Sequence, residues 1–299
     1  MTAPSATALR VDCPAKINLG LWIRGPRPDG YHDIDTIFQA VTLEDELHVS
    51  LSGHGFSLEP HGIPIPGPGP NLLERAYALL AERRGGSLPG MAVTLTKRIP
   101  VGGGLGGGSS DAAGFLAAAS RLLGLPDDPD SLVEAASRLG ADVPFFLVGG
   151  TARGTGRGDR VRQIGPIPAC WIVLATPSTA VSTTWAFGLL RNRLTARICD
   201  ASMLAAAIER GDWNAIVSSL HNDFEDVVLP EVSGVGDLRR AFAARGGPGS
   251  LLSGSGSTVF ALTQEREHAL AMAEEGKRLG AWVHVARPCE RGVRVTQLV

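Results

Sequence analysis

The spacing of apolar residues alternates along the chain between the period of helices and the period of strands. Helical spacing predicts helices at residues 110–123, 130–139, 201–209, 212–220, 235–244 and 265–279, with a further one that opens at Asn71. Alternating or continuous apolar runs predict strands at residues 9–23, 47–51, 91–96, 171–175, 258–262, 282–286 and 293–298. Because strands and helices interleave throughout, this order predicts a protein of mixed α and β class.

Clusters of glycine and proline interrupt these elements at three places. Residues 24–32 and 60–70 have the composition of turns and are predicted to be irregular. Residues 153–160, with the sequence Arg-Gly-Thr-Gly-Arg-Gly-Asp-Arg, are predicted to form a hinge. A chain of 299 residues is long enough for two domains, so we expect domains at 1–163 and 164–299.

The overall composition is that of an ordinary globular protein, with 44% hydrophobic and 19% charged residues. The net charge of -2 gives no reason to expect a nucleic-acid partner. No run of eighteen apolar residues predicts a membrane span, and the first ten residues lack the pattern of a signal peptide, so a cytoplasmic protein is expected. The widely spaced cysteines predict buried free thiols: Cys13, Cys170, Cys199 and Cys289.

Residues 100–110, with the sequence Pro-Val-Gly-Gly-Gly-Leu-Gly-Gly-Gly-Ser-Ser, lie between a predicted strand and a predicted helix. Glycines let the backbone approach a ligand, and the unpaired amides of the helix start attract an anion, so this loop is expected to bind phosphate. The dinucleotide fingerprint fits at Gly102, Gly104 and Gly107, but its ribose-binding acid would follow a helix instead of a second strand. A Walker loop would need a lysine after Gly108, where Ser109 stands.

Four segments together resemble the motifs of the GHMP kinase family. Residues 100–110 resemble its phosphate loop, and residues 14–19 its first motif, Pro-Ala-Lys-x-Asn-Leu. Residues 252–260 resemble its third motif, and residues 140–146 the segment with its proposed catalytic aspartate. The resemblance implies an α+β fold of two domains, with an N-terminal domain like the second domain of ribosomal protein S5 and a ferredoxin-like C-terminal domain.

The resemblance also implies an ATP-dependent kinase that phosphorylates a small alcohol. Asp142 would accept the proton of the hydroxyl, and Lys16 would stabilise charge beside it. Mg²⁺ is expected with ATP, and the sequence offers no cluster of metal ligands of its own. The residues expected to bind ATP are Asn71, Pro100, Gly102, Gly103, Gly104, Leu105, Gly106, Gly107, Gly108, Ser109 and Ser110.

Within the family, the chain resembles the branch that acts on a cytidyl-diphosphate sugar alcohol. Residues 27–32 resemble its Arg-x-Asp-Gly-Tyr-His segment, and residues 222–225 its Asn-Asp-Phe-Glu segment. Tyr31 and His32 would then contact the cytosine, since an aromatic ring can stack on a base. The residues expected to bind this substrate are Asn18, Tyr31, His32, Asp142 and Gly254. Trp185 is a further candidate for the wall of the cleft.

Several alternatives stay open at this point. Asp142 could cap a helix, because Pro144 follows it in a typical first-turn position, and Lys16 could be an ordinary surface lysine. Asp111 departs from the asparagine of some relatives and would repel phosphate unless it caps the helix or meets a cation. At the level of function, the alternatives are a mevalonate-, homoserine- or sugar-type kinase, a nucleotide-binding regulator that lost catalysis, and a Rossmann dehydrogenase. A monomer or weak homodimer is expected.

Overall fold

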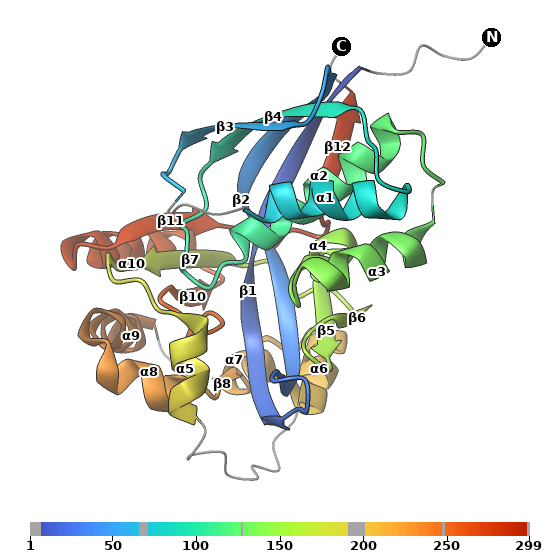
Figure 1. The fold of residues 1–299 in the computed structure, drawn as a ribbon. Helices are drawn as coiled ribbons and strands as arrows, with labels where there is room; N and C mark the ends of the chain where they lie inside the picture. The colour runs from blue at the N-terminus through green and yellow to red at the C-terminus, as the bar shows by residue number, and fades with distance from the viewer. Residues whose placement is uncertain (1–6, 66–70, 127, 191–200, 247–248, 298–299) are drawn as a thin grey trace.

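The computed structural model describes residues 7–65, 71–126, 128–190, 201–246 and 249–297 (Figure 1). These residues form two β-sheets with helices packed around them. The first sheet has the strand order β12-β1-β2-β4-β3, with β5, β6 and β8 attached beside this path. The second sheet has the order β11-β7-β10-β9. The mixed α and β class predicted from the sequence is confirmed.

A long hairpin of β1 (Ala8–Pro26) and β2 (His32–Ser52) forms the spine of the first sheet and runs through most of the molecule's height (Figure 1). β1 is buried from Val11 to Ile23, because helices cover one of its faces and the second sheet packs on the other. Every second residue from Leu9 to Ile23 is apolar, which is the period of a strand and explains why the sequence revealed β1. The start of β2 was missed because polar residues there, such as Asp35 and Thr36, form hydrogen bonds with neighbouring elements.

The remaining strands of the first sheet are short. They are β3 (Phe56–Gly62), β4 (Gly90–Lys97), β5 (Thr151–Thr155), β6 (Arg160–Gln163), β8 (His221–Asn222) and β12 (Arg294–Gln297). Two predictions are corrected here. Residues 60–62 end a strand paired with β4, although residues 60–70 were expected to be irregular and 66–70 lie outside the described residues. The predicted hinge at 153–160 is wrong: these residues belong to an antiparallel hairpin of β5 and β6, which β5 attaches to β2.

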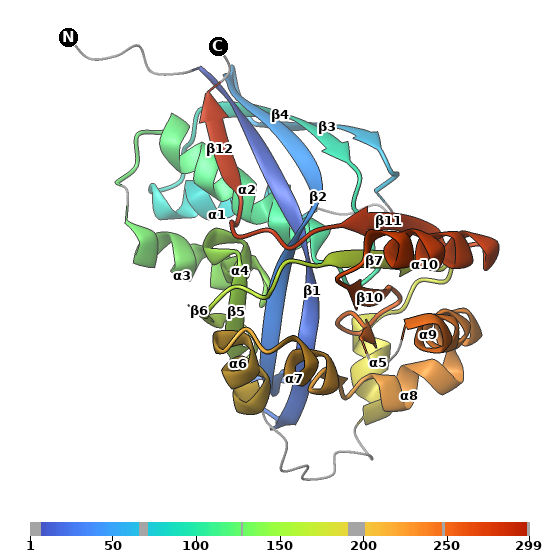
Figure 2. The ribbon, with the colours of Figure 1, turned by 180° about the vertical axis from the view of Figure 1, so that it is seen from behind.

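Four helices cover one face of the first sheet (Figures 1 and 2). They are α1 (Leu72–Arg83), α2 (Gly107–Leu122), α3 (Pro129–Leu139) and α4 (Val143–Val148). Helix α2 is rich in alanine and glycine and lies close against β1: a Cβ added at Gly114 would come within 2.5 Å of Cys13 Sγ. Phe38, Phe115 and Phe145 fill the space between these helices and the sheet. This core fixes the start of α2 relative to β1.

The second sheet is buried on both faces. It consists of β7 (Trp171–Thr176), β9 (Ser250–Leu252), β10 (Val259–Thr263) and β11 (Trp282–Ala286). Ile172 and Leu174 face the first sheet, α6 (Ala201–Glu209) and α7 (Trp213–Ser218). Val173 and Ala175 face the opposite side. The helices on that side are α5 (Thr183–Leu190), α8 (Glu225–Glu231), α9 (Ser233–Gly246) and α10 (Arg266–Arg278).

The structure also bears on the state of the cysteines and on membrane-spanning helices. Cys13 and Cys170 are free and buried as predicted, whereas Cys289 is half-buried and Cys199 lies outside the described residues. Among the helices that the structure describes, none combines the length and the apolar character that a bilayer crossing would require.

Candidate active site

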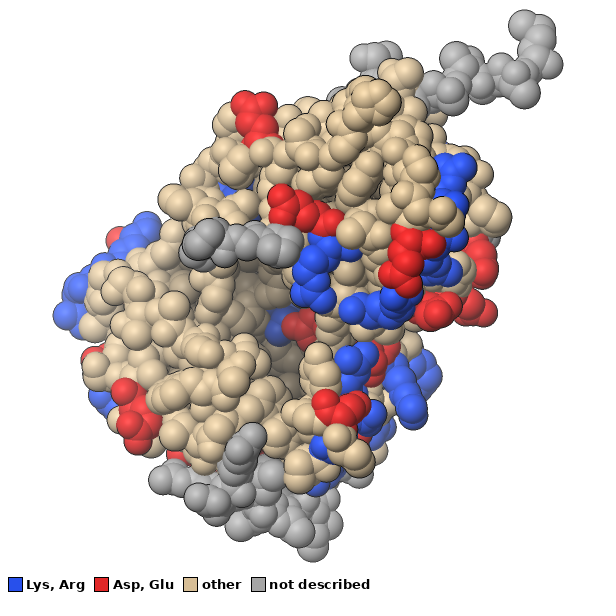
Figure 3. Space-filling view, viewed as in Figure 1, with Lys and Arg blue, Asp and Glu red and all other residues tan. Residues whose placement is uncertain are grey.

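The described residues line a cavity of about 680 Å³ that opens on the face shown in Figure 3. Its walls come from β1, the loop before α2, the start of α1, the residues before α4, helix α5 and the loop before β10. The structure therefore brings together segments from both halves of the chain. The predicted site residues that line it are Lys16, Asn18, Tyr31, His32, Asn71, Pro100, Gly102, Gly103, Gly104, Leu105, Gly106, Gly107, Gly108, Ser109, Asp142 and Gly254.

The loop of residues 100–106 uses its glycines for two purposes. Gly102, Gly104 and Gly106 have φ values of 72°, 77° and 72°, a left-handed conformation that glycine adopts without strain. A side chain at Gly104 would also collide with the loop before β10, because its Cβ would lie 2.2 Å from the carbonyl oxygen of Ser253. The alternation of left-handed glycines thus lets the loop turn into α2 while it stays packed against the second sheet.

Helix α2 begins at the end of this loop and directs its first amides at the cavity. Its N-cap is Gly106, which provides no side chain to accept a hydrogen bond from the first turn. Gly107, Gly108 and Ser109 precede the first intrahelical hydrogen bond, from the amide of Ser110 to the carbonyl of Gly106. A 16-residue helix with an open first turn carries partial positive charge there, which suits a phosphate group. Ser110 itself is fully buried and does not line the cavity.

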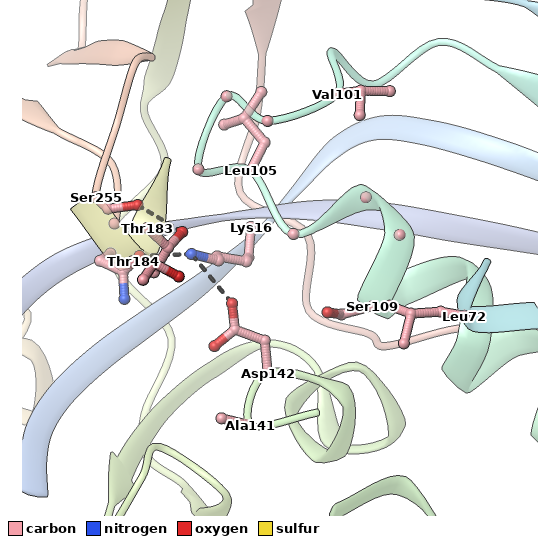
Figure 4. A pocket seen from close by; sticks show the side chains of 18 of the residues that line it. Lys16, Leu72, Val101, Leu105, Ser109, Ala141, Asp142, Thr183, Thr184 and Ser255 are labelled. Atoms are coloured by element: carbon pink, nitrogen blue, oxygen red, sulfur yellow. Dashed lines mark hydrogen bonds and ion pairs between the residues drawn. The ribbon is translucent and has the colours of Figure 1, made fainter. Parts of the chain in front are cut away.

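Lys16 and Asp142 point toward each other and form an ion pair in the cavity (Figure 4). Lys16 Nζ lies 3.5 Å from Asp142 Oδ2 and donates a 2.7 Å hydrogen bond to Asn18 Oδ1. Asn18 in turn donates to Thr36, so the ammonium group is held by a buried network on β1 and β2. Only 4% of the Lys16 side chain is exposed, which excludes the surface-lysine alternative.

Asp142 occupies the N-cap position of α4, but its side chain accepts no capping hydrogen bond. Pro144 stands in the first turn, as the sequence suggested. One third of the Asp142 side chain remains exposed toward the cavity. The carboxylate is therefore available to a ligand and is not used to stabilise the helix, so the helix-cap interpretation is wrong.

Asp111, which the sequence left without a role, meets a buried cation. Lys97 Nζ lies 2.7 Å from Asp111 Oδ2 and 2.5 Å from Asp45 Oδ2, and all three side chains are almost completely buried. Burial raises the pKa of the Asp111 carboxyl to about 7, with Lys97 opposing and Asp45 adding to the shift. The pKa of Lys97 is raised too: burial lowers it, but the two carboxylates outweigh that effect. This cluster connects α2 to the neighbouring strands just behind the phosphate loop.

Besides Asp142, the loop before β10 also lies close to Lys16. A Cβ at Gly254 would lie 3.3 Å from Lys16 Nζ, and Gly254 has a φ of 56°. The side chain of Asn222 holds this loop by donating to the carbonyls of Leu252 and Gly254, both at 2.8 Å. Glu225 accepts a further bond from the Leu252 amide at 3.0 Å. The Asn-Asp-Phe-Glu segment that the sequence marked thus positions the loop.

A group of rings lines the other end of the cavity. Tyr31 is 50% exposed, and His32 stacks on Phe187 with 4.6 Å between the ring centroids. Phe187 also meets Phe224 edge to face at 4.9 Å. Sequence reasoning missed Phe187 and named Trp185 only as a further candidate, and Trp185 does not line the cavity. The two residues lie on the same short helix, and only the helix's orientation decides which one faces inward.

Asn71 caps α1 and lies at the rim of the cavity. Its side chain accepts from the Glu74 amide at 3.0 Å, and the Glu74 side chain accepts from the Asn71 amide at 3.0 Å. This reciprocal pair explains why the helix begins there. Its predicted position near the adenine stays a prediction. Among the described residues, no group of three or more acidic, histidine or cysteine side chains is arranged to hold a metal.

Comparison with known sequences points to one family along most of the chain. The N-terminal domain pattern of GHMP kinases matches residues 71–150, and the C-terminal pattern of GHMP kinases matches residues 204–281. A 4-diphosphocytidyl-2-C-methyl-D-erythritol kinase from Geobacter sulfurreducens is 40% identical over 93% of this chain and 98% of that protein. The kinase of the same name from Pelotomaculum thermopropionicum is 38% identical over 91% of this chain and 95% of that protein.

Solved structures agree with this comparison. A crystal structure of 4-(cytidine 5'-diphospho)-2C-methyl-D-erythritol kinase superimposes with a TM-score of 0.76 at 33% identity, covering 93% of this chain and 98% of that one. A homoserine kinase from Cytophaga hutchinsonii superimposes with a TM-score of 0.78 but only 22% identity, covering 99% of both chains. The second likeness concerns the fold alone. The two-domain fold expected from the sequence motifs is confirmed.

Proposed function

This chain belongs to the GHMP kinase family, and we infer that it transfers the γ-phosphoryl group of ATP to the 2-hydroxyl of 4-diphosphocytidyl-2-C-methyl-D-erythritol, a step of isoprenoid biosynthesis. Relatives of that name match it along almost its whole length. The observation that carries the proposal is the Lys16–Asp142 pair, which faces the open first turn of α2 across one cavity. A base, a cation and a phosphate site in one cavity are what phosphoryl transfer to an alcohol requires.

We propose that Asp142 removes the proton of the attacking hydroxyl. Its carboxylate is exposed to the cavity and makes no capping bond, so it can accept that proton. The oxygen then forms a bond to the γ-phosphorus while the bond to the β-phosphate oxygen breaks and ADP leaves. Lys16, held by Asn18, stabilises the negative charge that develops on the attacking oxygen.

The phosphates of ATP would bind to the loop of residues 100–106 and the first turn of α2. The left-handed glycines bring backbone close to the ligand, and the open amides donate to phosphate oxygens. Asn71 would lie near the adenine. Mg²⁺ would enter as the complex with ATP and neutralise charge between the phosphates. Ser110 was also expected to bind ATP, but it is buried beneath the turn, does not line the cavity, and its hydroxyl has no hydrogen-bond partner among the described residues.

The cytidyl end of the substrate would bind among the rings at the far end of the cavity. Tyr31 and His32 would contact the cytosine, and Phe187 would add an aromatic wall that the sequence did not reveal. Gly254 and Asn18 would lie between this end and the reacting hydroxyl, beside Lys16.

We further propose a division into domains at 1–163 and 164–299, which the family matches on either side of that position support. In this division β12 belongs to the second domain by sequence but pairs with β1 in the sheet of the first domain. The enzyme would act in the cytoplasm as a monomer or weak homodimer, with neither nucleic acid nor membrane as a partner. Light scattering after size-exclusion chromatography measures the oligomeric state.

The test of the proposed function is ADP release with Mg²⁺ and ATP, with 4-diphosphocytidyl-2-C-methyl-D-erythritol, mevalonate, homoserine and galactose as acceptors in parallel. Turnover with the cytidyl substrate alone is expected, because the ring cluster offers a base-stacking site. Turnover with a different acceptor would retain the kinase activity and reject the cytosine site. Binding of ATP without turnover of any acceptor would favour a regulator.

A further inference from the structure

The β5–β6 hairpin packs against the segment that carries Tyr31. The amide of Ile34, just after that segment, donates to the carbonyl of Gly156 in the hairpin turn at 2.7 Å. Two further bonds in the segment are local: the Arg27 amide donates to the carbonyl of Tyr31 at 2.8 Å, and the Asp29 side chain accepts from the Tyr31 amide at 3.1 Å. The hairpin is thus a support that comes from more than a hundred residues away in the sequence.

Arg157, at the tip of this hairpin, lies over the ring of Tyr31. Its guanidinium carbon is 4.8 Å from the ring centroid, within the range of a cation–π interaction. The guanidinium is itself fixed, because Nε and Nη2 donate to Asp159 at 3.0 and 2.6 Å and Nη2 also donates to the Ser137 carbonyl at 3.1 Å. Arg157 also lines the cavity.

The exposure of Tyr31 shows why such a support matters. Half of this side chain is exposed at the cavity, so its ring has little apolar packing to restrict it. Arg157 covers one face of the ring, which leaves the second face for a planar ligand. A ring that is held in place before binding loses less conformational entropy when a base stacks on it.

We propose that Arg157 is a positioning residue that determines affinity for the cytidyl end of the substrate by holding Tyr31 as a fixed stacking surface. This inference rests on the proposed function, because it takes the base of the substrate as the planar ligand. Arg157 acts through Tyr31 and takes no part in phosphoryl transfer. Its effect therefore falls on binding of the cytidyl substrate, and ATP binding and the chemical step are independent of it.

The experiment compares Arg157→Met with Arg160→Met, a matched control on the same hairpin whose side chain is exposed. Arg157→Met is expected to raise KM for the cytidyl substrate between about twofold and thirtyfold, with kcat and KM for ATP unchanged. Arg160→Met should match the wild type in all three constants. An unchanged or lowered KM in Arg157→Met overturns the proposal.

A double-mutant cycle with Tyr31→Ala separates this role from general support of the fold. If Arg157 acts through the ring, Arg157→Met should change KM less than about twofold once the ring is gone. A full effect in the Tyr31→Ala background would mean that Arg157 contacts the substrate directly, and would overturn the proposal. Should Arg157→Met fail to fold, Arg157→Lys retains the cation and should stay within about threefold of the wild-type KM.

Calorimetric titration with 4-diphosphocytidyl-2-C-methyl-D-erythritol measures binding of this substrate without turnover, so it tests the role of Arg157 independently of catalysis. Wild-type turnover tests the function alone. The titration detects base stacking without turnover, so an inactive protein that binds the substrate still reports on Arg157. Weaker binding in Arg157→Met than in Arg160→Met supports the proposal, and equal binding, or no binding by the wild type, overturns it.

Discussion

Replacement of Asp142 by asparagine separates catalysis from folding. The asparagine keeps an oxygen at this position but cannot take up the hydroxyl proton. Loss of a general base lowers the rate about 10²- to 10⁴-fold, which corresponds to roughly 3 to 5 kcal/mol in the activation free energy. We therefore expect Asp142→Asn to lower kcat at least about a hundredfold in an assay of ADP release, with KM for ATP close to the wild-type value.

The effect on folding should be much smaller. Asp142 caps nothing, and Lys16 keeps its 2.7 Å bond to Asn18 after the substitution. The free energy of unfolding should fall by no more than about 2 kcal/mol, which thermal denaturation measures as a drop in Tm of less than about 8 °C. The loss of activity should therefore persist at temperatures where the variant is fully folded.

Asp212 provides the matched control, because its side chain does cap a helix. It accepts a 3.0 Å bond from the Ala215 amide at the start of α7 and does not line the cavity. Asp212→Ala should lower stability by about 1 kcal/mol and leave kcat unchanged. A kcat within tenfold of the wild type in Asp142→Asn would refute the role of this residue as the base. If Asp142→Asn regained wild-type activity at a lower temperature, the loss would reflect unfolding, and the role as the base would again be refuted.

Three further predictions concern the surroundings of the cavity. Gly104→Ala should raise KM for ATP more than tenfold and lower Tm, because the new Cβ would lie 2.2 Å from the Ser253 carbonyl oxygen. Gly124 also has a left-handed backbone but open space around it, so Gly124→Ala should lower Tm without changing KM for ATP. Asn222→Asp should lower kcat about tenfold, because it removes the amide donor that holds the loop before β10. Asn214→Asp, at an exposed helix position, should have no effect in the same assay. For Asp111, the pKa of about 7 in the folded protein exceeds its ordinary value of 3.8, so the folded state holds the extra proton between these values and stability falls as pH rises through that window. Urea denaturation at pH 5 and pH 7 should therefore show a decline of more than about 1 kcal/mol in the wild type, and a flatter dependence in Asp111→Asn; equal slopes would contradict the burial argument.

The phosphate loop could be read from the sequence because its chemistry is local. A run of glycines before a helix start determines both the backbone conformation and the open amides, whatever the rest of the fold does. The same holds for Asn71, whose capping pair with Glu74 lies within four residues. Residues 9–23 were equally clear, since apolar residues alternate there with other residues at the period of a strand.

The parts that the sequence did not reveal depend on distant contacts. Asp111 could not be understood without Lys97, which reaches it from β4, and Phe187 could not be told from Trp185 without the orientation of α5. Residues 153–160 have the composition of a flexible linker, but pairing with β2 and β6 gives their backbone hydrogen bonds. Tertiary contacts outweigh local composition at each of these positions.

The elements that hold Lys16 and Asp142 are both contacted by strand β12 and the residue before it, which are synthesised late. Strand β12 pairs with β1, the strand of Lys16, and the preceding amide of Val293 bonds to the carbonyl of Phe146 in α4, the helix that follows Asp142. Both partners of the pair are therefore braced by residues translated some 150 residues or more after them. During translation the nascent chain would carry the phosphate loop and both reactive side chains well before this brace exists. We therefore expect full activity only after residues 294–297 have emerged from the ribosome and paired with β1.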